Sequence, residues 1–271
     1  MTNWDEAVQS NKALWNELTA IHARGETYQM TAFKEGTKHL DPLVLTEVGD
    51  VTGKSLLHLQ CHFGMDTLMW ARLGARVTGV DLANEAVALA RQLSAEIGVP
   101  ATFIESNLYE LPQLLADEFD LVYTSWGVLN WLPDLTQWGQ IIARYLKPGG
   151  FFYIAEGHPF LTMFYDGEDA VNLRVHYGYF HQPQPLYFPP GHDYADQTQR
   201  VTNPEYTWQH SVGDILNALV DAGLRIAYLH EHTFLPWKAL PFLVHDEQGY
   251  WRLPSEYPRL PLSFSLKATK A

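Results

Sequence analysis

The sequence has one cysteine, few basic residues and no long apolar run. A lone cysteine, Cys61, excludes an internal disulfide and fits a reducing compartment, so we expect a cytoplasmic protein. No apolar stretch approaches the ~20 residues that span a bilayer, and the first residues lack a secretory signal pattern, so we expect no membrane partner. Eighteen Lys and Arg against 31 Asp and Glu give a net charge of -13. This balance argues against a nucleic-acid partner, because affinity for phosphates comes from basic side chains.

What is present predicts a globular chain with a large core: 271 residues, of which 46% are hydrophobic and 18% charged. Between residues 54 and 155 short apolar runs alternate with helical patterns, which is typical of a parallel sheet covered on both faces. We expect strands at 55–59, 76–80, 101–104, 119–124 and 151–155, and helices at 65–73, 84–97 and 135–146. The last helix should stop at 147–150, which reads Lys-Pro-Gly-Gly.

The rest of the chain differs in pattern. Residues 1–50 have apolar residues at helical spacing and predict an N-terminal helical cap on a ligand-binding core at 51–156. Residues 157–207, here called the insertion, are rich in proline, aromatics and histidine without a clear period, which favours a lid or substrate-binding segment. Residues 208–271 should complete the core sheet, with a helix at 211–222, a strand at 224–229, an irregular stretch at 232–260 and a last strand at 261–269.

The first strand feeds a tight turn, residues 60–64, which reads Gln-Cys-His-Phe-Gly. Asp81 ends the second strand, 17 residues after Gly64. In doubly wound sheets a ligand lies outside the carboxyl ends of the strands, where such a carboxylate can accept from both hydroxyls of a ribose. The alternative interpretation of Asp81 is a helix cap before Asn84.

Three later segments narrow the choice of ligand. Phe-Asp-Leu-Val-Tyr-Thr-Ser at 119–125 is followed by Val-Leu-Asn-Trp-Leu-Pro-Asp at 128–134 and Leu-Lys-Pro-Gly-Gly-Phe at 146–151. This succession resembles the class I S-adenosylmethionine-dependent methyltransferases of the type-11 kind, over roughly residues 50–156. The resemblance implies a Rossmann-like, doubly wound α/β fold with a seven-stranded, mainly parallel sheet whose last strand, 261–269, runs antiparallel. It also implies in-line transfer of a methyl group from S-adenosyl-L-methionine to a small-molecule acceptor.

The turn departs from the family pattern. Members usually read acid-x-Gly-x-Gly-x-Gly, whereas this chain has His58, Gln60 and His62 and keeps only Gly64. Glycine serves where the backbone needs positive φ, so we expect a wider or differently turned loop. The turn is similar to that of a bacterial subset reading Gln-Cys-His-Phe-Gly-x-Asp-Thr. The resemblance then implies that His58, Gln60 and His62 contact the methionine part of the cofactor with their side chains.

Most of the remaining cofactor residues also follow from the resemblance. Leu82 and Leu108 would sandwich the adenine, and Asn107 would accept from its amino group where the family has an acid. Ser125 and Trp126 would border the methionine part. Tyr28 does not come from the resemblance: it lies after the N-terminal helix and is a candidate to close over the methionine end, with surface packing as the alternative. Ordinary core packing is the alternative for the leucines and the tryptophan. The full cofactor set comprises Tyr28, His58, Gln60, Cys61, His62, Gly64, Asp81, Leu82, Ser106, Asn107, Leu108, Ser125 and Trp126, with Cys61 interpreted as structural.

His158 follows the fifth strand directly and is our candidate general base; a turn histidine bonded to backbone is the alternative. We expect no metal site, because His176, His181, His192 and His210 lack the short spacings of zinc ligands. Aromatic residues of the insertion should build a small core of their own or line a pocket for the acceptor. They are Phe160, Phe164, Tyr165, Tyr177, Tyr179, Phe180, Tyr187 and Phe188.

Three other functions compete with this interpretation. A non-catalytic protein that binds S-adenosylmethionine or S-adenosylhomocysteine fits the altered turn. An NAD-dependent oxidoreductase would need Gly-x-Gly-x-x-Gly after the first strand. A nucleic-acid methyltransferase would need an Asn-Pro-Pro-Tyr type element where this chain has 124–127, Thr-Ser-Trp-Gly. The sequence leaves open the acceptor and the oligomeric state, a homodimer being one option.

Overall fold

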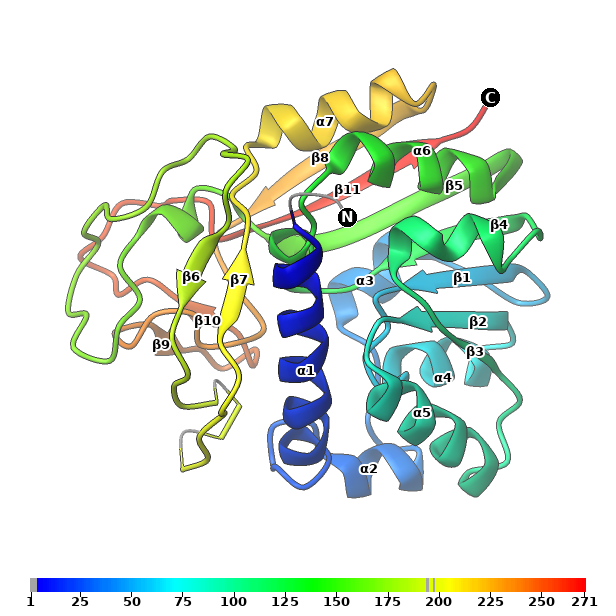
Figure 1. Ribbon diagram of the computed structural model, residues 1–271, viewed down its shortest axis with the longest axis horizontal. Helices are drawn as coiled ribbons and strands as arrows, with labels where there is room; N and C mark the ends of the chain where they lie inside the picture. Colours follow the sequence, from blue (N-terminus) through cyan, green and yellow to red (C-terminus); the bar gives the residue numbers. More distant parts are fainter. Residues whose placement is uncertain (1–3, 194, 197) are drawn as a thin grey trace.

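A seven-stranded sheet forms the centre of the computed structural model, which describes residues 4–193, 195–196 and 198–271 (Figure 1). The strand order is β3-β2-β1-β4-β5-β11-β8. The strands are β1 (Ser55–Leu59), β2 (Arg76–Asp81), β3 (Thr102–Glu105), β4 (Phe119–Thr124), β5 (Leu146–Gly157), β8 (Arg225–His232) and β11 (Ser263–Thr269). The first five pair in parallel, whereas β11 runs antiparallel to both β5 and β8. The predicted mainly parallel sheet and its antiparallel last strand are confirmed.

Helices cover both faces of this sheet because its strands are apolar on both sides. Along β1, Leu57 and Leu59 face a core shared with α6 (Leu135–Tyr145) and α7 (Val212–Asp221). Leu56 faces the opposite core, shared with α3 (Pro42–Val48), α4 (Met65–Arg72) and α5 (Asn84–Glu96). The fold is therefore a three-layer α/β arrangement, as the alternation of strands and helices predicts. None of the helices described is long and apolar enough to cross a membrane.

Local chemistry fixes the ends and the packing of α7. Ser211 caps it by accepting from the backbone N–H of Asp214 at 3.1 Å, and Asp214 accepts in return from the Ser211 N–H at 2.8 Å. This reciprocal pair is a capping box. Gly139 lets α6 approach α7, because a Cβ there would lie 2.2 Å from the Ala218 carbonyl oxygen. The close packing of α6 against α7 thus requires a glycine at position 139, within a helix.

The segment between α6 and β5 differs from expectation. Residues 147–150 were expected to stop the helix ahead of a strand at 151–155; α6 does end at Tyr145, but β5 begins at Leu146, directly after it. The extra residues fit because the pairing with β4 shifts register between Phe119 and Leu121, and Gly149 takes a φ of 77°. Lys147 fastens this irregular start through a 3.0 Å ion pair with Asp120. The Lys-Pro-Gly-Gly element is therefore the bulged first part of a strand.

Helix α1 (Asp5–His22) stands across the end of the sheet, between it and a short pair of strands, β6 (Leu186–Phe188) and β7 (Glu205–Thr207) (Figure 1). On one side the amide of Asn16 donates to Asn84 at the start of α5. On the other side Asn11 bonds the carbonyl and the N–H of Tyr206 at 2.7 and 2.9 Å. The short α2 (Met30–Glu35) follows. Helix α1 therefore joins the core to the insertion.

The two irregular stretches contain more order than the sequence suggested. The insertion holds a 3-10 turn, η3 (Leu161–Met163), as well as β6 and β7. Residues 232–260 hold a second short pair, β9 (Val244–His245) and β10 (Trp251–Arg252). A small satellite core joins the two stretches beneath the surface, formed by Leu161, Leu235, Leu240, Leu243 and Leu262. The strands in both stretches were missed because each is only two or three residues long.

Candidate active site

A cavity of about 1150 Å³ opens at the carboxyl ends of the parallel strands, bounded by the sheet, α1 and the insertion. All thirteen residues predicted to bind a cofactor line it: Tyr28, His58, Gln60, Cys61, His62, Gly64, Asp81, Leu82, Ser106, Asn107, Leu108, Ser125 and Trp126. They come from segments spread over about a hundred residues, and the parallel register brings the strand ends to one edge. The structure thus unites the predicted residues, while their individual roles stay predictions.

The turn after β1 keeps positive φ without glycine. Gln60, His62 and Gly64 have φ values of 55°, 51° and 73°, at the three positions where the family pattern has glycine. The expectation of a differently turned loop is therefore wrong. A left-handed conformation costs a side-chain-bearing residue ~1–2 kcal/mol. Bonds at the turn offset this cost, since the His62 N–H donates to Asp81 at 2.7 Å and the Gln60 amide donates to the Val128 carbonyl at 3.1 Å.

Asp81 supports the turn and faces the cavity. One carboxylate oxygen accepts from the His62 N–H, and the other accepts from the Ala83 N–H at 2.9 Å. Ala83, not Asp81, is the N-cap of α5, so the helix-cap alternative is wrong. Burial raises the pKa of Asp81 to about 6, against the opposing effect of these backbone donors. Each carboxylate oxygen retains a further lone pair, which can accept a hydroxyl from a ligand in the cavity.

His58 is a buried, neutral positioning residue. Its Nδ1 lies 2.8 Å from Thr67 Oγ1 and its Nε2 lies 3.1 Å from Ser125 Oγ. Burial lowers the pKa of His58 to about 3, so the ring carries no charge at neutral pH. With both nitrogens engaged by the protein, His58 orients Ser125 on the cavity wall. The implied contact of its ring nitrogens with a methionine part is not supported by this geometry.

Two polar atoms on the turn are buried without a hydrogen-bond partner among the described residues. They are Gln60 Oε1 and His62 Nδ1. His62 Nε2 does have a partner, because it lies 3.0 Å from Nδ1 of His22. Burial and the neighbouring His22 hold the pKa of His62 well below its usual range, so the ring is neutral. Buried polar atoms normally find partners, and these two lie where a ligand would supply them.

Glu156, at the end of β5, organises the next wall and was missed by the sequence reasoning. Its carboxylate accepts from the N–H groups of Gly127, Val128 and Leu129 at 2.6, 2.7 and 3.1 Å, and of Gly157 at 2.7 Å. Burial raises its pKa, while these donors act in the opposite direction. The loop after β4, including η2 (Leu129–Trp131), is therefore anchored to β5. Only the position of Glu156 at a strand end could have indicated this role.

Lys38 and Asp66 place opposite charges on the cavity wall, and the sequence reasoning missed both as well. Lys38 Nζ donates to the Tyr28 carbonyl at 3.0 Å, and Asp66 accepts from the Tyr123 hydroxyl at 3.2 Å. Burial lowers the pKa of Lys38 and raises that of Asp66, while each charge partly offsets the shift of the other. Asp66 supplies a carboxylate near the turn, where the family pattern has an acid and this chain has His58. The signal was present, since Asp66 is the acid of the Gln-Cys-His-Phe-Gly-x-Asp-Thr turn.

The far end of the cofactor set is mostly apolar. Leu82 and Leu108 both line the cavity, and Leu108 also packs into the core. Asn107 Oδ1 accepts from the Tyr109 N–H at 3.1 Å and so caps the 3-10 turn η1 (Leu108–Gln113). This carbonyl oxygen keeps one lone pair for a ligand. On the opposite wall, Trp126 packs edge-on against Trp237 with ring centroids 5.9 Å apart.

Comparison with known proteins identifies the core. Residues 57–154 match the model of a family described as "Methyltransferase domain". The ubiquinone biosynthesis O-methyltransferase of Proteus mirabilis is 27% identical over 52% of this chain and 64% of that protein. The same enzyme of Xanthomonas axonopodis pv. citri is 35% identical over 43% of the chain and 49% of its own length. An S-adenosylmethionine-dependent methyltransferase structure from Mesorhizobium loti matches with a TM-score of 0.59 at 22% identity, covering 84% of this chain and 95% of that one.

Residues 57–154 thus match a methyltransferase domain, and the fold is that of S-adenosylmethionine-dependent methyltransferase structures. The chain spans about half to two thirds of the length of the curated relatives that it matches. The family match covers the turn, Asp81 and the wall after β4, and it ends before the insertion. The remaining site residues therefore rest on the geometry of this structure.

His158 does not line the cavity beside the methyltransferase domain. Its Nδ1 accepts from the Phe160 N–H at 3.0 Å, which leaves the proton on Nε2, 3.0 Å from a carboxylate oxygen of Glu231. The ring lies edge-on to Phe264, near the end of β11. A residue just beyond a strand can point to either side, and this one points away from the ligand space. The geometry gives no support to His158 as the general base and matches the turn-histidine alternative.

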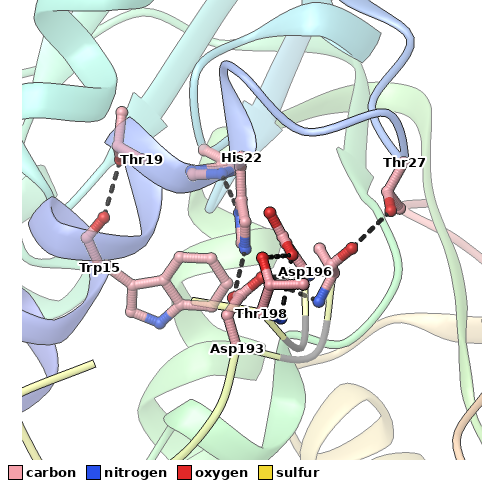
Figure 2. A network of polar contacts seen from close by, with 9 residues as sticks. Trp15, Thr19, His22, Thr27, Asp193, Asp196 and Thr198 are labelled. Carbon is pink, nitrogen blue, oxygen red and sulfur yellow. Dashed lines mark hydrogen bonds and ion pairs between the residues drawn. The ribbon is translucent and has the colours of Figure 1, made fainter. Parts of the chain in front are cut away.

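A buried chain of contacts joins the insertion to the turn of the methyltransferase domain. Figure 2 shows His22 of α1 and Asp193 of the insertion pointing toward each other, with His22 Nε2 2.9 Å from Asp193 Oδ2. The other oxygen of Asp193 accepts from the N–H groups of Ala195 and Asp196 at 2.9 and 2.6 Å. Since His22 also contacts His62, three distant segments meet at this wall.

The aromatic residues of the insertion divide between two environments. Phe164, Tyr177 and Phe188 line the cavity, whereas Phe180 and Tyr187 are 71% and 56% exposed. The insertion therefore contributes a partly aromatic wall and not a closed core of its own. In the described part of the chain, no group of three or more His, Cys, Asp or Glu is arranged to hold a metal ion.

Proposed function

We propose that this protein is an S-adenosylmethionine-dependent methyltransferase that modifies a small molecule held between the core and the insertion. One observation carries the proposal: the thirteen residues predicted to bind the cofactor line a single cavity, at the edge of the sheet where doubly wound folds bind ligands. The match of residues 57–154 to a methyltransferase domain supports the same conclusion.

The residues of the cavity fit the cofactor in three places. Asp81 offers acceptors to the two ribose hydroxyls, and the apolar Leu82 and Leu108 suit the faces of an adenine. Lys38 and Asp66 match the carboxylate and ammonium of a methionine end. The unpartnered Gln60 Oε1 would accept from that ammonium, which explains an otherwise orphaned buried oxygen. Asn107 and Ser106 would complete the adenine end.

When bound, S-adenosylmethionine supplies an electrophilic methyl group on a sulfonium. The protein then has to hold an acceptor in line and keep water out. Trp126 and Trp237 form an apolar wall beside Ser125. Glu156 fixes the loop after β4, which carries Ser125 and Trp126, by accepting from its N–H groups. His22 and Asp193 hold the opposite wall in place through their buried contact. These residues act by position and not by chemistry.

The volume of the cavity supports a second ligand beside the cofactor. Pockets for one drug-sized molecule measure about 300–1,000 Å³, and this cavity is larger at about 1150 Å³. We assign residues 1–50 as the cap, 51–156 as the cofactor-binding core, 157–207 as the lid over the acceptor and 208–271 as the completion of the sheet. A cytoplasmic location and a small-molecule rather than a nucleic-acid acceptor fit the single cysteine and the net charge of -13.

Isothermal titration calorimetry with S-adenosylhomocysteine, S-adenosylmethionine and NAD tests the cofactor. We expect both sulfur compounds to bind with one site per chain and NAD to give no heat. Release of S-adenosylhomocysteine in the presence of acceptors then tests turnover. Uptake of NAD alone would favour the oxidoreductase. Binding of both sulfur compounds without turnover of a broad acceptor panel would favour the non-catalytic binding protein.

A further inference from the structure

The insertion gives its part of the cavity wall an acidic character. Among the described residues of 157–207, four acids line the cavity and no lysine or arginine does: Asp166, Glu168, Asp193 and Glu205. Asp193 is paired with His22, and both Asp166 and Glu168 are exposed. Asp166 differs from Glu168 in lying close enough to Glu205 for its charge to raise the pKa of that carboxyl. Asp166 and Glu205 are therefore the two acids of interest.

Glu205 is a deeply placed carboxylate without a bonding partner. It begins β7 and sits opposite Phe188 in the register of β6 and β7. None of the described residues makes a hydrogen bond or an ion pair with its carboxylate, although the side chain is only partly exposed and lines the cavity. Burial raises the pKa of Glu205 to about 7, and the negative charge of Asp166 adds to this effect. A desolvated carboxylate of this kind gains most from a cationic N–H donor.

Asp166 and the aromatic residues around it complete a surface suited to a cation. The Tyr177 hydroxyl lies 3.4 Å from Asp166 Oδ1, and the Asp166 side chain is otherwise exposed. Tyr177, Phe188 and Trp208 line the same cavity. Aromatic faces attract organic cations by ~0.5–2 kcal/mol. Two carboxylates with aromatic neighbours would repel an anionic acceptor and give a neutral hydroxyl no charge to match.

We propose that the acceptor is an organic amine, whose nitrogen binds at Glu205 and Asp166 and gives its proton to Glu205. The inference rests on the proposed function, because it names the substrate of that site. An ammonium has no lone pair, so one N–H proton must leave first, and it passes to the Glu205 carboxylate. The neutral nitrogen then forms a bond to the methyl carbon as the bond from carbon to sulfur breaks and its electron pair stays on sulfur. The positive charge moves from sulfur to the methylated nitrogen, where Asp166 balances it.

Matched acceptor pairs test the inference with the intact protein and S-adenosylmethionine. The probes are benzylamine against benzyl alcohol and 2-phenylethylamine against 2-phenylethanol, with release of S-adenosylhomocysteine as the readout. We expect turnover with at least one amine and none with its hydroxyl counterpart. Turnover of hydroxyl probes in preference to amines, or of no amine in the panel, would overturn the inference while calorimetric binding of S-adenosylhomocysteine upholds the cofactor site. Absence of that binding would overturn the proposed function and the inference together.

Variants separate a catalytic Glu205 from a structural one. Glu205→Gln should lower kcat/KM for the amine at least about a hundredfold, the lower range for loss of a general base, and leave the affinity for S-adenosylhomocysteine within twofold. Glu205→Asp should restore part of kcat. Asp166→Asn should act mainly by raising KM. Glu256→Gln makes the same chemical change at an exposed site away from the cavity and should alter nothing.

A Glu205→Gln enzyme that is folded by circular dichroism and still methylates the amine at the wild-type rate would refute the role. If that variant does not fold, Asp166→Asn gives the decision, since an unchanged KM would then count against the site. A methyl-transfer activity that requires Mg²⁺ and is lost on adding EDTA would also count against the role of Glu205 as a base, because the two carboxylates would then hold a metal ion.

Discussion

Replacement of Asp81 by asparagine tests the cofactor site most directly. The carboxylate faces the cavity and would accept two ribose hydroxyls while holding the N–H groups of His62 and Ala83. Hydrogen bonds to a charged group contribute ~1.5–3 kcal/mol, which corresponds to a loss of about 10- to 150-fold in affinity. Asparagine keeps the shape of the side chain, but its NH2 group would face one of the backbone N–H donors. We therefore also expect a lower free energy of unfolding. Isothermal titration with S-adenosylhomocysteine measures the loss without turnover.

The pH dependence makes this prediction sharper. The pKa of Asp81 is raised to about 6, and the ribose hydroxyls favour the ionised form. Affinity should therefore be constant above pH 6 and fall as the pH drops below it, by up to about tenfold per unit for one coupled proton. Comparison with Asp81→Asn at each pH isolates this contribution from that of Asp66, because the variant lacks only the first group.

Asp120→Asn is the matched control. Asp120 accepts from the Ser55 N–H at 2.7 Å and pairs with Lys147, at the opposite end of β4 from the cavity. This variant should lose stability but bind S-adenosylhomocysteine as the wild type does. If Asp81→Asn binds within twofold of the wild type, or loses no more affinity than the control, the ribose does not lie at Asp81 and the reasoning fails.

Three further predictions concern the walls of the cavity. Glu156→Gln leaves two of four backbone N–H groups without their acceptor, because each carboxylate oxygen accepts from two of them, and should lower the free energy of unfolding by ~1.5–3 kcal/mol in a denaturant titration; an unchanged midpoint would contradict the anchoring role. Gly64→Ala should lower the unfolding free energy by more than ~1–2 kcal/mol, because φ is 73° and the new Cβ would meet Phe103 at 2.5 Å; a calorimetric Tm equal to that of the wild type would refute it. Asp193→Asn removes the charged partner of His22 and should speed limited proteolysis within 189–203 severalfold, whereas an equal cleavage rate would show that the contact does not hold this wall.

The core was predictable because its signals are local. Strand β1 was placed at its observed bounds, and α5 and α6 end one residue before their predicted ends. Hydrophobic runs and the Ser211 cap depend only on neighbouring residues. Most of the predicted cofactor set came from the family resemblance, and its members line one cavity because strand ends in parallel register meet at one edge. The left-handed Gln60 and His62 were not predictable, because the bonds that hold them come from Asp81 and Val128.

The missed site residues depend on contacts between distant segments. Glu205 reaches the cavity because β7 packs against α1 at the end of the sheet, and Lys38, after α2, is held there by its bond to the Tyr28 carbonyl. No spacing in the sequence encodes that arrangement. His158 shows the converse case, since its position after β5 was predicted correctly but its side chain turns toward Glu231. The direction in which a side chain points at a strand end is set by the local backbone and by the residue with which that side chain interacts.

Helix α1 has a consequence for engineering this scaffold. Its polar side chains make hydrogen bonds to two neighbours. Asn16 bonds to the start of α5, and Asn11 and Glu17 bond to residues 202–206. A graft that exchanges the insertion for a segment from another protein would leave these side chains facing a foreign backbone. The insertion can therefore be exchanged only together with the first helix, as a unit of two sequence-distant pieces.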